Sequence, residues 1–292
     1  MTTLTTRTGQ QYSSATPYKL KAFRYLMGYH AGVCELIMKK YSQPYIYIDL
    51  NCGAGDQPEY CEFGDEVLGS PIIALQELNK KGIHPICHFC DSNQEALDNL
   101  KVAIQSRSLR CEAHYWFGDN KNSLLSIAEG LCDSQFNGLI YSDPNGKQDF
   151  PLSEIKQVIH LPQMRKVDIL MNAATTYLKR WEANPKVNWE PPSLNDITFD
   201  NGKERTFIRQ PEDEDRSMKW TFIYATNWAK QKNLEKIRLY DINSEIGREI
   251  SNHISNPKST ALPIDRDGTI GIQQKLDLST DDSNTGNTEV DS

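Results

Sequence analysis

The stretch Tyr45–Pro71, YIYIDLNCGAGDQPEYCEFGDEVLGSP, contains the strongest fold signal in the chain. Its first residues are apolar or aromatic apart from Asp49, and a turn with Gly53 and Gly55 follows. A short apolar run that ends in a glycine turn is typical of a buried parallel strand feeding a tight loop. Glycines at this spacing allow positive φ and let a ligand approach the backbone closely. The stretch therefore predicts an α/β fold with a ligand-binding loop after its first core strand.

Two common nucleotide-binding loops do not fit this turn. A phosphate-binding P-loop needs Gly-Lys-Ser/Thr, which this stretch lacks. The dinucleotide fingerprint needs a third glycine where a helix begins, but Gln57 and Pro58 follow Asp56 at that point. A Rossmann-like dehydrogenase is therefore disfavoured. An acidic residue followed by Gly-x-Gly is the pattern that remains.

Length and composition predict one embellished domain in a chain of 292 residues. We expect residues 1–16 to be disordered, because they are rich in Thr, Ser and Gln. Residues 17–254 are expected to form the domain, and residues 255–292 an acidic disordered tail. Residues 184–218 are polar, contain four prolines and show no clear period, so they are interpreted as an insertion or a substrate lid.

Cysteine usage predicts a reduced, cytoplasmic chain without a metal site. The seven cysteines are odd in number and scattered. Cys87 and Cys90 have the spacing of a metal-binding pair. Strand alternation places them on opposite faces, and no second pair follows at zinc-ribbon spacing. We therefore expect no bound metal.

Charge and hydropathy bear on the partners of the chain. No stretch approaches the roughly 18 consecutive apolar residues of a membrane span, and no signal peptide is recognisable, so we expect no membrane association. The formal net charge is −7, and residues 1–40 carry six basic side chains against one acidic one. A mildly acidic body with a basic entry segment permits nucleic acid but supplies no broad electrostatic footprint for it. The basic segment is equally well explained as a solvated helix face.

Acidic residues follow three consecutive predicted strands, as Asp49, Asp91 and Asp119. Each of them alone could be a simple cap at the end of a strand. Together they indicate a site, because ligands of open α/β sheets bind at the carboxyl ends of the strands. A carboxylate at the second strand end, here Asp91, can accept hydrogen bonds from two ribose hydroxyls.

The second half of the chain supplies the remaining strands. Residues 136–142 predict a fourth strand that runs into Asp143-Pro144-Asn145-Gly146, a sequence that also makes a good β-turn. Residues 167–172 predict a fifth strand, followed by a helix from Ala173. Residues 220–225 and 237–242 predict a hairpin that closes a seven-stranded sheet.

With these elements in place, the chain resembles the three-Cys-motif partner (TcmP) family of the class I S-adenosylmethionine (SAM)-dependent methyltransferases. The matching segments lie between residues 17 and 228 in the family's order: TPYKLKAFRYL, YIDLNCGAGD, GSPIIAL, DPNG, ILMNAATTYLKR and FIYATN. The most specific part is YIDL-x-x-G-x-G with Gly-Ser-Pro about fourteen residues later. Family members more often have Phe-Ala-Gly-Pro-Gly at residues 51–55 and an aromatic residue in place of Asn145.

The resemblance implies a Rossmann-like methyltransferase sheet of seven strands, the last one antiparallel, with helices on both faces. It implies SAM as the cofactor, held by residues of the glycine turn and by the acids at the strand ends. The cofactor-binding residues would be Asp49, Asn51, Gly53, Gly55, Asp91 and Asp119. The catalytic tetrapeptide of amino-methyltransferases would correspond to Asp143, Pro144 and Asn145.

The function that follows is SAM-dependent methyl transfer, with a nucleic-acid base as the preferred acceptor and Lys179 and Arg180 as phosphate contacts. Tyr141 or Trp181 would supply stacking, although core packing explains Tyr141 better. The resemblance also implies an association with a radical-SAM-like protein that carries the three-Cys motif. The alternative is a non-catalytic SAM-binding or accessory subunit that works with this partner. Asn145 and Gly146 favour it, because they leave the tetrapeptide without its base-stacking aromatic.

Overall fold

The computed structural model describes residues 4–5, 11–12, 16–56, 68–131, 135–144, 151–174, 201–210, 220–228 and 234–255. Its strands are β1 (Leu4–Thr5), β2 (Gln11–Tyr12), β3 (Tyr45–Asp49), β4 (Ile86–Asp91), β5 (Glu112–Phe117), β6 (Asn137–Ser142), β7 (Lys166–Ala174), β8 (Arg205–Arg209), β9 (Trp220–Thr226) and β10 (Leu239–Asp241). Its α-helices are α1 (Thr16–Tyr41), α2 (Ser70–Lys80), α3 (Gln94–Ser106), α4 (Asn120–Gly130), α5 (Leu152–Ile159) and α8 (Glu245–Ser255), and its short 3-10 helices are η2 (Pro162–Met164) and η3 (Leu234–Ile237).

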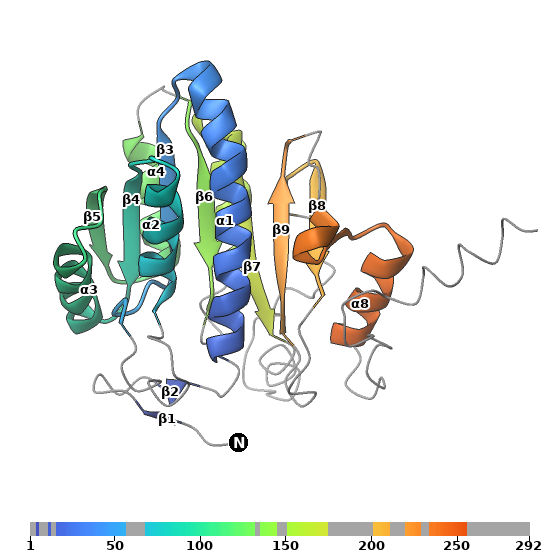
Figure 1. The fold of residues 1–292 in the computed structure, drawn as a ribbon, viewed down its shortest axis with the longest axis horizontal. Coiled ribbons are helices and arrows are strands. Elements are labelled where there is room, and N and C mark those ends of the chain that lie inside the picture. The colour runs from blue at the N-terminus through green and yellow to red at the C-terminus, as the bar shows by residue number, and fades with distance from the viewer. Residues whose placement is uncertain are drawn as a thin grey trace, which may run out of the picture.

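The main sheet has eight strands in the order β10-β8-β9-β7-β6-β3-β4-β5 (Figure 1). All strands from β3 to β7 run parallel to one another. β9 runs antiparallel to both β7 and β8, and β10 is antiparallel to β8 at the edge. The predicted α/β class, a Rossmann-like sheet with parallel central strands, is therefore confirmed, with eight strands where seven were expected.

The predicted closing hairpin is wrong in its pairing. β9 and β10, the two segments assigned to it, are not neighbours, because β8 lies between them. β8 falls inside residues 184–218, which were interpreted as an insertion or a lid. Its apolar run is only Phe207 and Ile208 between polar residues, too short to signal a strand. β7 also extends to Ala174, where the sequence predicted a helix, and residues 175–181 lie outside the described part of the chain.

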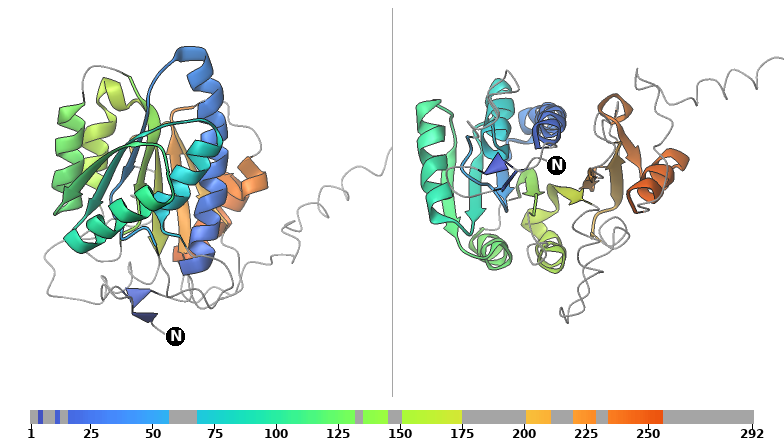
Figure 2. Two further views of the ribbon diagram at one scale, coloured as in Figure 1. Left: turned by 60° about the vertical axis from the view of Figure 1, so that its left-hand side comes forward. Right: turned by 90° about the horizontal axis from the view of Figure 1, so that it is seen from below.

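Helices cover both faces of the sheet (Figure 2). α1, α2 and α3 pack on one face and α4, α5 and α8 on the other. Alternation along β3 separates the two cores, because Tyr45 and Tyr47 face α1 and α2 whereas Ile46 and Ile48 face the opposite helices. The same alternation separates the buried Cys87 and Cys90, as predicted. Within the described ranges, no group of three or more His, Cys, Asp or Glu side chains is arranged to hold a metal ion.

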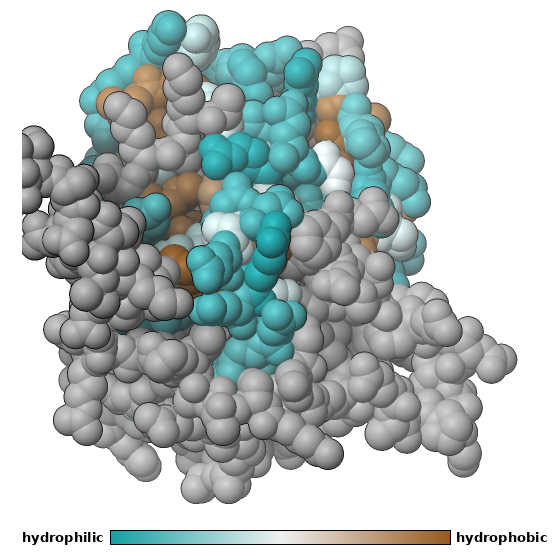
Figure 3. All heavy atoms as spheres, turned by 90° about the vertical axis from the view of Figure 1, so that its right-hand side faces the viewer, coloured by the Kyte–Doolittle hydropathy of each residue, from teal (hydrophilic) through white to brown (hydrophobic). Residues whose placement is uncertain are grey.

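Two further features complete the outline. In the segment predicted to be disordered, β1 and β2 form a short antiparallel ladder. Seen from the side of α8, the described surface is mostly hydrophilic, with small hydrophobic patches between polar side chains (Figure 3). Among the helices that the structure describes, none has the length and apolar character needed to traverse a membrane.

Candidate functional site

The candidate site lies at the carboxyl edge of the parallel strands. β3, β4, β5 and β6 all end at this edge, so it collects residues that are far apart in the sequence. The first turn of α1 lies at the same edge (Figure 1). The predicted acids Asp49, Asp91 and Asp143 each hydrogen-bond to Asn51 or Gly53 of the glycine turn. The fourth predicted acid, Asp119, caps α4.

Asp49 ends β3 and is completely buried. Its Oδ2 accepts hydrogen bonds from the Tyr47 hydroxyl at 2.9 Å and from the Ser70 hydroxyl at 2.8 Å. Its Oδ1 accepts from the backbone N–H of Asn51 at 3.2 Å. Burial raises the pKa of Asp49 to about 7, the three donors oppose this rise, and the negative charge of Asp143 adds to it. Asp49 is therefore a carboxyl group whose charge changes near neutral pH.

The glycine turn after β3 is tied directly to the end of β4. The backbone N–H of Gly53 donates to Oδ2 of Asp91 at 2.8 Å, and that of Asn93 donates to Oδ1 at 2.8 Å. Gly53 has φ +62°, a conformation that favours glycine. The Cys52 N–H donates to the Cys90 carbonyl at 3.1 Å, so the turn follows β4 beyond the end of β3. Gly53 and Asp91 thus form one structural unit, as a shared ligand site requires.

Gly55 lies in a tightly packed part of the glycine turn. Its φ is +81°, and a Cβ added there would lie 2.7 Å from Leu100 Cδ1 and 3.2 Å from Ile72 Cγ1. The absence of a side chain is therefore required by packing against α2 and α3. The Gly69 N–H donates to the Gly55 carbonyl at 2.6 Å and holds the start of α2 against the end of the glycine turn. Close approach of a ligand to Gly55 stays a prediction.

Asp119 is exposed and acts as the N-cap of α4. Its Oδ1 accepts from the backbone N–H of Lys121 at 2.9 Å and of Asn122 at 3.1 Å. This is the capping role that an acid at the end of a strand has by default. Contact with a cofactor at this position remains a prediction.

Asp143 follows β6 and is held on both carboxylate oxygens. Lys19 Nζ lies 2.5 Å from Oδ2, and Asn172 Nδ2 donates to Oδ1 at 2.7 Å. The backbone N–H of Asp143 donates to Oδ1 of Asn51 at 3.2 Å, which joins this residue to the glycine turn. Pro144 is buried beside it. Asn145 lies outside the described residues, as do Gly146, Lys179, Arg180 and Trp181.

Sequence reasoning missed three residues of the site: Lys19, Ser70 and Asn172. Ser70 is the first residue of α2, whose N-cap is Gly69, and the Ser70 hydroxyl bonds to Asp49. A buried carboxylate needs this donor more than an N-terminal N–H of α2 needs a capping oxygen. The basic excess of the N-terminal segment was the only signal for Lys19. No sequence signal pointed to Asn172, because its pattern is that of the polar end of a strand.

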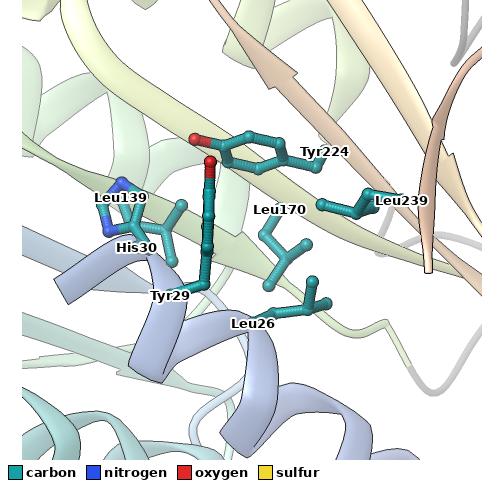
Figure 4. A pocket seen from close by; sticks show the side chains of 7 residues that line it. All are labelled: Leu26, Tyr29, His30, Leu139, Leu170, Tyr224 and Leu239. Carbon is teal, nitrogen blue, oxygen red and sulfur yellow. The ribbon is translucent and has the colours of Figure 1, made fainter. Parts of the chain in front are cut away.

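The pocket in Figure 4 is separate from this edge. It lies beneath α1 in the body of the sheet and is lined by Leu26, Tyr29, His30, Leu139, Leu170, Tyr224 and Leu239. Its volume of about 10 Å³ is near the minimum that one water molecule needs. Next to it, His30 Nε2 lies 3.3 Å from Asp168 Oδ2, and the Tyr224 hydroxyl donates to the same oxygen. This space is too small for a cofactor, so we assign it to the core.

Comparison with known proteins supplies no family. No family model and no curated protein matches the chain. Among solved structures, protein LPL1258 from Legionella pneumophila is similar, with a TM-score of 0.44, 11% identity and coverage of 82% of this chain and 95% of that one. A methyltransferase from Geobacter sulfurreducens has a TM-score of 0.37 and 11% identity, covering 67% and 77%. SMU.1697c from Streptococcus mutans, solved with S-adenosylhomocysteine (SAH), has a TM-score of 0.34 and 7% identity, covering 63% and 89%.

Proposed function

We propose that the protein is a SAM-dependent methyltransferase that transfers a methyl group to a nitrogen atom of a nucleic-acid base. The observation that carries this proposal is the bond from the Gly53 N–H to the Asp91 carboxylate. It joins a glycine turn to an acid across two neighbouring strand ends, with Asp49 and Asp143 on the same edge. This arrangement suits a ligand with a ribose, a charged amino-acid part and a reactive centre.

The residues fit the cofactor group by group. Asp91 uses one acceptor position on each oxygen for the backbone, which leaves others for the ribose hydroxyls. Gly53 brings backbone close to the amino-acid part, and Asp49 orients its amino group, directly or through a water molecule. Asp119 would accept from the adenine amino group with the oxygen that does not cap α4. Asn51 links this half of the site to Asp143.

The charge of the edge favours a cationic ligand. Asp49, Asp91 and Asp143 contribute up to three negative charges, and Lys19 is the one cationic side chain bonded to any of them among the described residues. When bound, SAM supplies a methyl group activated by a positive sulfonium. An excess of carboxylates attracts this cation more than it attracts neutral SAH. The same charges therefore favour exchange of product for fresh cofactor.

Asp143 is the candidate for contact with the acceptor. Its carboxylate can accept an N–H of the target amino group and orient the nitrogen lone pair. Pro144 would stiffen the turn, and Asn145 would offer further polar contacts. The proton lost by the amine would pass to Asp143 or to solvent. Methyl transfer otherwise requires mainly in-line positioning and exclusion of water.

Calorimetric titration with SAM and SAH tests the cofactor site. We expect micromolar binding, about −8 kcal/mol, and a loss of at least about tenfold in Asp91→Asn, because an amide cannot accept ribose hydroxyls on both atoms. Asp98→Asn, an exposed acid on α3 that bonds to Lys101 and Gln94, is the matched control and should bind as the wild type does. A folded wild-type protein that binds neither compound would refute the proposal.

One observation favours the second candidate function, an accessory subunit of a three-Cys-motif, radical-SAM-like partner. Asp143 already has a cation and an amide on its carboxylate, so it is less available to an acceptor than a free carboxylate would be. An accessory role predicts that the complex with this partner keeps its activity when Asp143 is replaced by Ala. Loss of activity in that variant would favour the enzyme.

A further inference from the structure

We propose that Asp49 makes the site selective for SAM over SAH: the sulfonium of SAM supplies the positive charge that this buried carboxyl lacks, and the carboxyl gives up its proton when SAM binds. This inference rests on the proposed function and assigns the discrimination to one residue. Asp49 ends β3, and its carboxylate bonds to β3 itself, to the glycine turn and to the first residue of α2. Its charge therefore lies at a junction of three segments of the carboxyl edge.

Compensation of charge distinguishes Asp49 from the other two acids that bond to the glycine turn. Asp143 is paired with Lys19, whose Nζ lies 2.5 Å from Oδ2. Asp91 is only half-buried, so water stabilises part of its charge. Asp49 is completely buried, and the described groups that bond to it are two hydroxyls and one N–H, all uncharged. A buried carboxylate without a cation is costly, so the charge of Asp49 gains most from an incoming cation.

The titratable groups that face Asp49 belong to several elements. They are Tyr47 on β3, Cys52 in the glycine turn, Cys87 and Cys90 on β4, and Tyr141 and Asp143 on and after β6. Burial raises the pKa of each of these thiols and phenols, so they stay protonated and neutral at neutral pH. The contact from α2 is the Ser70 hydroxyl, which does not titrate in this range. Asp143 is the charged neighbour, and its negative charge opposes ionisation of Asp49.

The hydrogen bonds of Asp49 indicate where its proton lies in the empty site. Oδ2 accepts from the Tyr47 and Ser70 hydroxyls, whereas the described donor to Oδ1 is one backbone N–H. Oδ1 is therefore the oxygen with room for a proton. Because burial raises the pKa of Asp49 to about 7, a large share of the molecules carry this proton at neutral pH. A cation bound nearby favours the ionised form, and the proton then passes from Oδ1 to solvent.

SAM and SAH separate the effect of the sulfonium from that of the rest of the cofactor. Both carry the same amino group, and they differ by the methyl group and its positive charge on sulfur. Proton release that exceeds the value for SAH therefore reports the sulfonium. The ratio of the affinity for SAM to the affinity for SAH should rise with pH below about 7 and level off above it, where Asp49 is already ionised. One proton limits this rise to about tenfold per pH unit.

Calorimetry of the full-length protein measures these quantities without a known acceptor. SAM and SAH are titrated from about pH 5.5 to about pH 8, in buffers with different ionisation enthalpies. In the wild type, SAM should release up to one proton more than SAH on the acidic side of neutral pH. In Asp49→Asn, the two ligands should release equal numbers of protons, and the affinity ratio should be lower and constant with pH. Asp98→Asn, which removes an exposed acid on α3, should match the wild type.

Two variants at Ser70 alter the ionisation of Asp49 while keeping its carboxyl group. Ser70→Ala removes a hydroxyl that lowers the pKa of Asp49, so the additional proton release should move to higher pH. Ser70→Thr keeps a hydroxyl at this position and should return the release toward the wild-type range. These variants give the same measurement if Asp49→Asn does not fold.

Equal proton release by SAM and SAH in the wild type, with an affinity ratio that is constant with pH, would overturn the inference while leaving the cofactor site intact. Additional release that persists in Asp49→Asn would also overturn it, because the titrating group would be another residue. If the folded wild type binds neither ligand, the proposed function fails and this inference fails with it. The two kinds of failure are therefore distinguishable in one set of titrations.

Discussion

Replacing Asp168 by Asn should destabilise the fold by about 3 kcal/mol. Asp168 lies on β7 and is almost completely buried. Its carboxylate forms an ion pair with His30 of α1 and accepts a hydrogen bond from the Tyr224 hydroxyl of β9. His30 also contacts the Tyr45 hydroxyl through Nδ1 at 3.0 Å, and Cys34 Sγ is 3.8 Å away. Asn keeps the volume of Asp168 and can still accept from Tyr224. The substitution therefore removes the charge alone and leaves a buried imidazolium without its carboxylate.

The pKa of His30 sets an upper limit on this loss of folding stability. Burial by itself would lower that pKa, but Cys34 and Asp168 outweigh it and raise the pKa to about 10. At neutral pH, His30 can lose its proton at a cost of about 1.4 kcal/mol per pH unit, or about 4 kcal/mol in all. A loss of about 3 kcal/mol corresponds to a fall in Tm of about 10 °C for a domain of this size.

The sign of the pH dependence provides a second test. The pKa of His30 in the folded state lies above its unfolded value of about 6.5, so its contribution is complete below that pH and is lost as pH rises through about 10. Urea denaturation of the wild type and Asp168→Asn should therefore show a difference that is largest at about pH 6 and shrinks toward about pH 10. Asp98→Asn is the exposed control. A difference under about 1 kcal/mol, or one that grows with pH, would refute the reasoning.

Two further predictions concern the glycine turn and its neighbours. Gly55→Ala should cost about 2–4 kcal/mol in urea denaturation, because its Cβ would lie 2.7 Å from Leu100 Cδ1 and its φ is positive. Gly82→Ala is its control, since Gly82 has φ +69° but open space around it, and should cost only about 1 kcal/mol; equal losses would show that packing is irrelevant. Ser70→Ala should raise the pKa of Asp49 further above its ordinary value, because the Ser70 hydroxyl lowers it. Carboxyl NMR titration measures this shift, and an unchanged or lower pKa would contradict the assigned bond.

Much of the parallel half of the sheet was predictable from local patterns. The apolar runs that form β3, β4 and β6 end where Asp49, Asp91 and Asp143 begin, and parallel strands bring such ends to one edge. In α1 and α3 the buried apolar residues recur at helical spacing, which is also a local pattern. These predictions succeeded because each depends on residues close together in the chain.

The antiparallel half was less predictable. β8 has too short an apolar run to be recognised, and its insertion between β9 and β10 depends on pairing across the whole sheet. A strand that is buried by its neighbours needs no strong pattern of its own, because tertiary contacts override local propensity. The hairpin expected from two nearby segments was therefore replaced by a pairing with a segment earlier in the chain.

The sequence by itself determined the order of strands and helices in the parallel half, the glycine turn and three acids at the edge, because local periodicity and turn chemistry set these features. Tertiary structure decided which groups these acids meet. It brought Lys19 to Asp143 and Ser70 to Asp49. It also packed α2 and α3 closely around Gly55 and placed Asp119 as the N-cap of α4. Such partners are chosen by the docking of helices on a sheet. Burial then requires each buried charge to find a donor or a counter-charge wherever the chain has placed one.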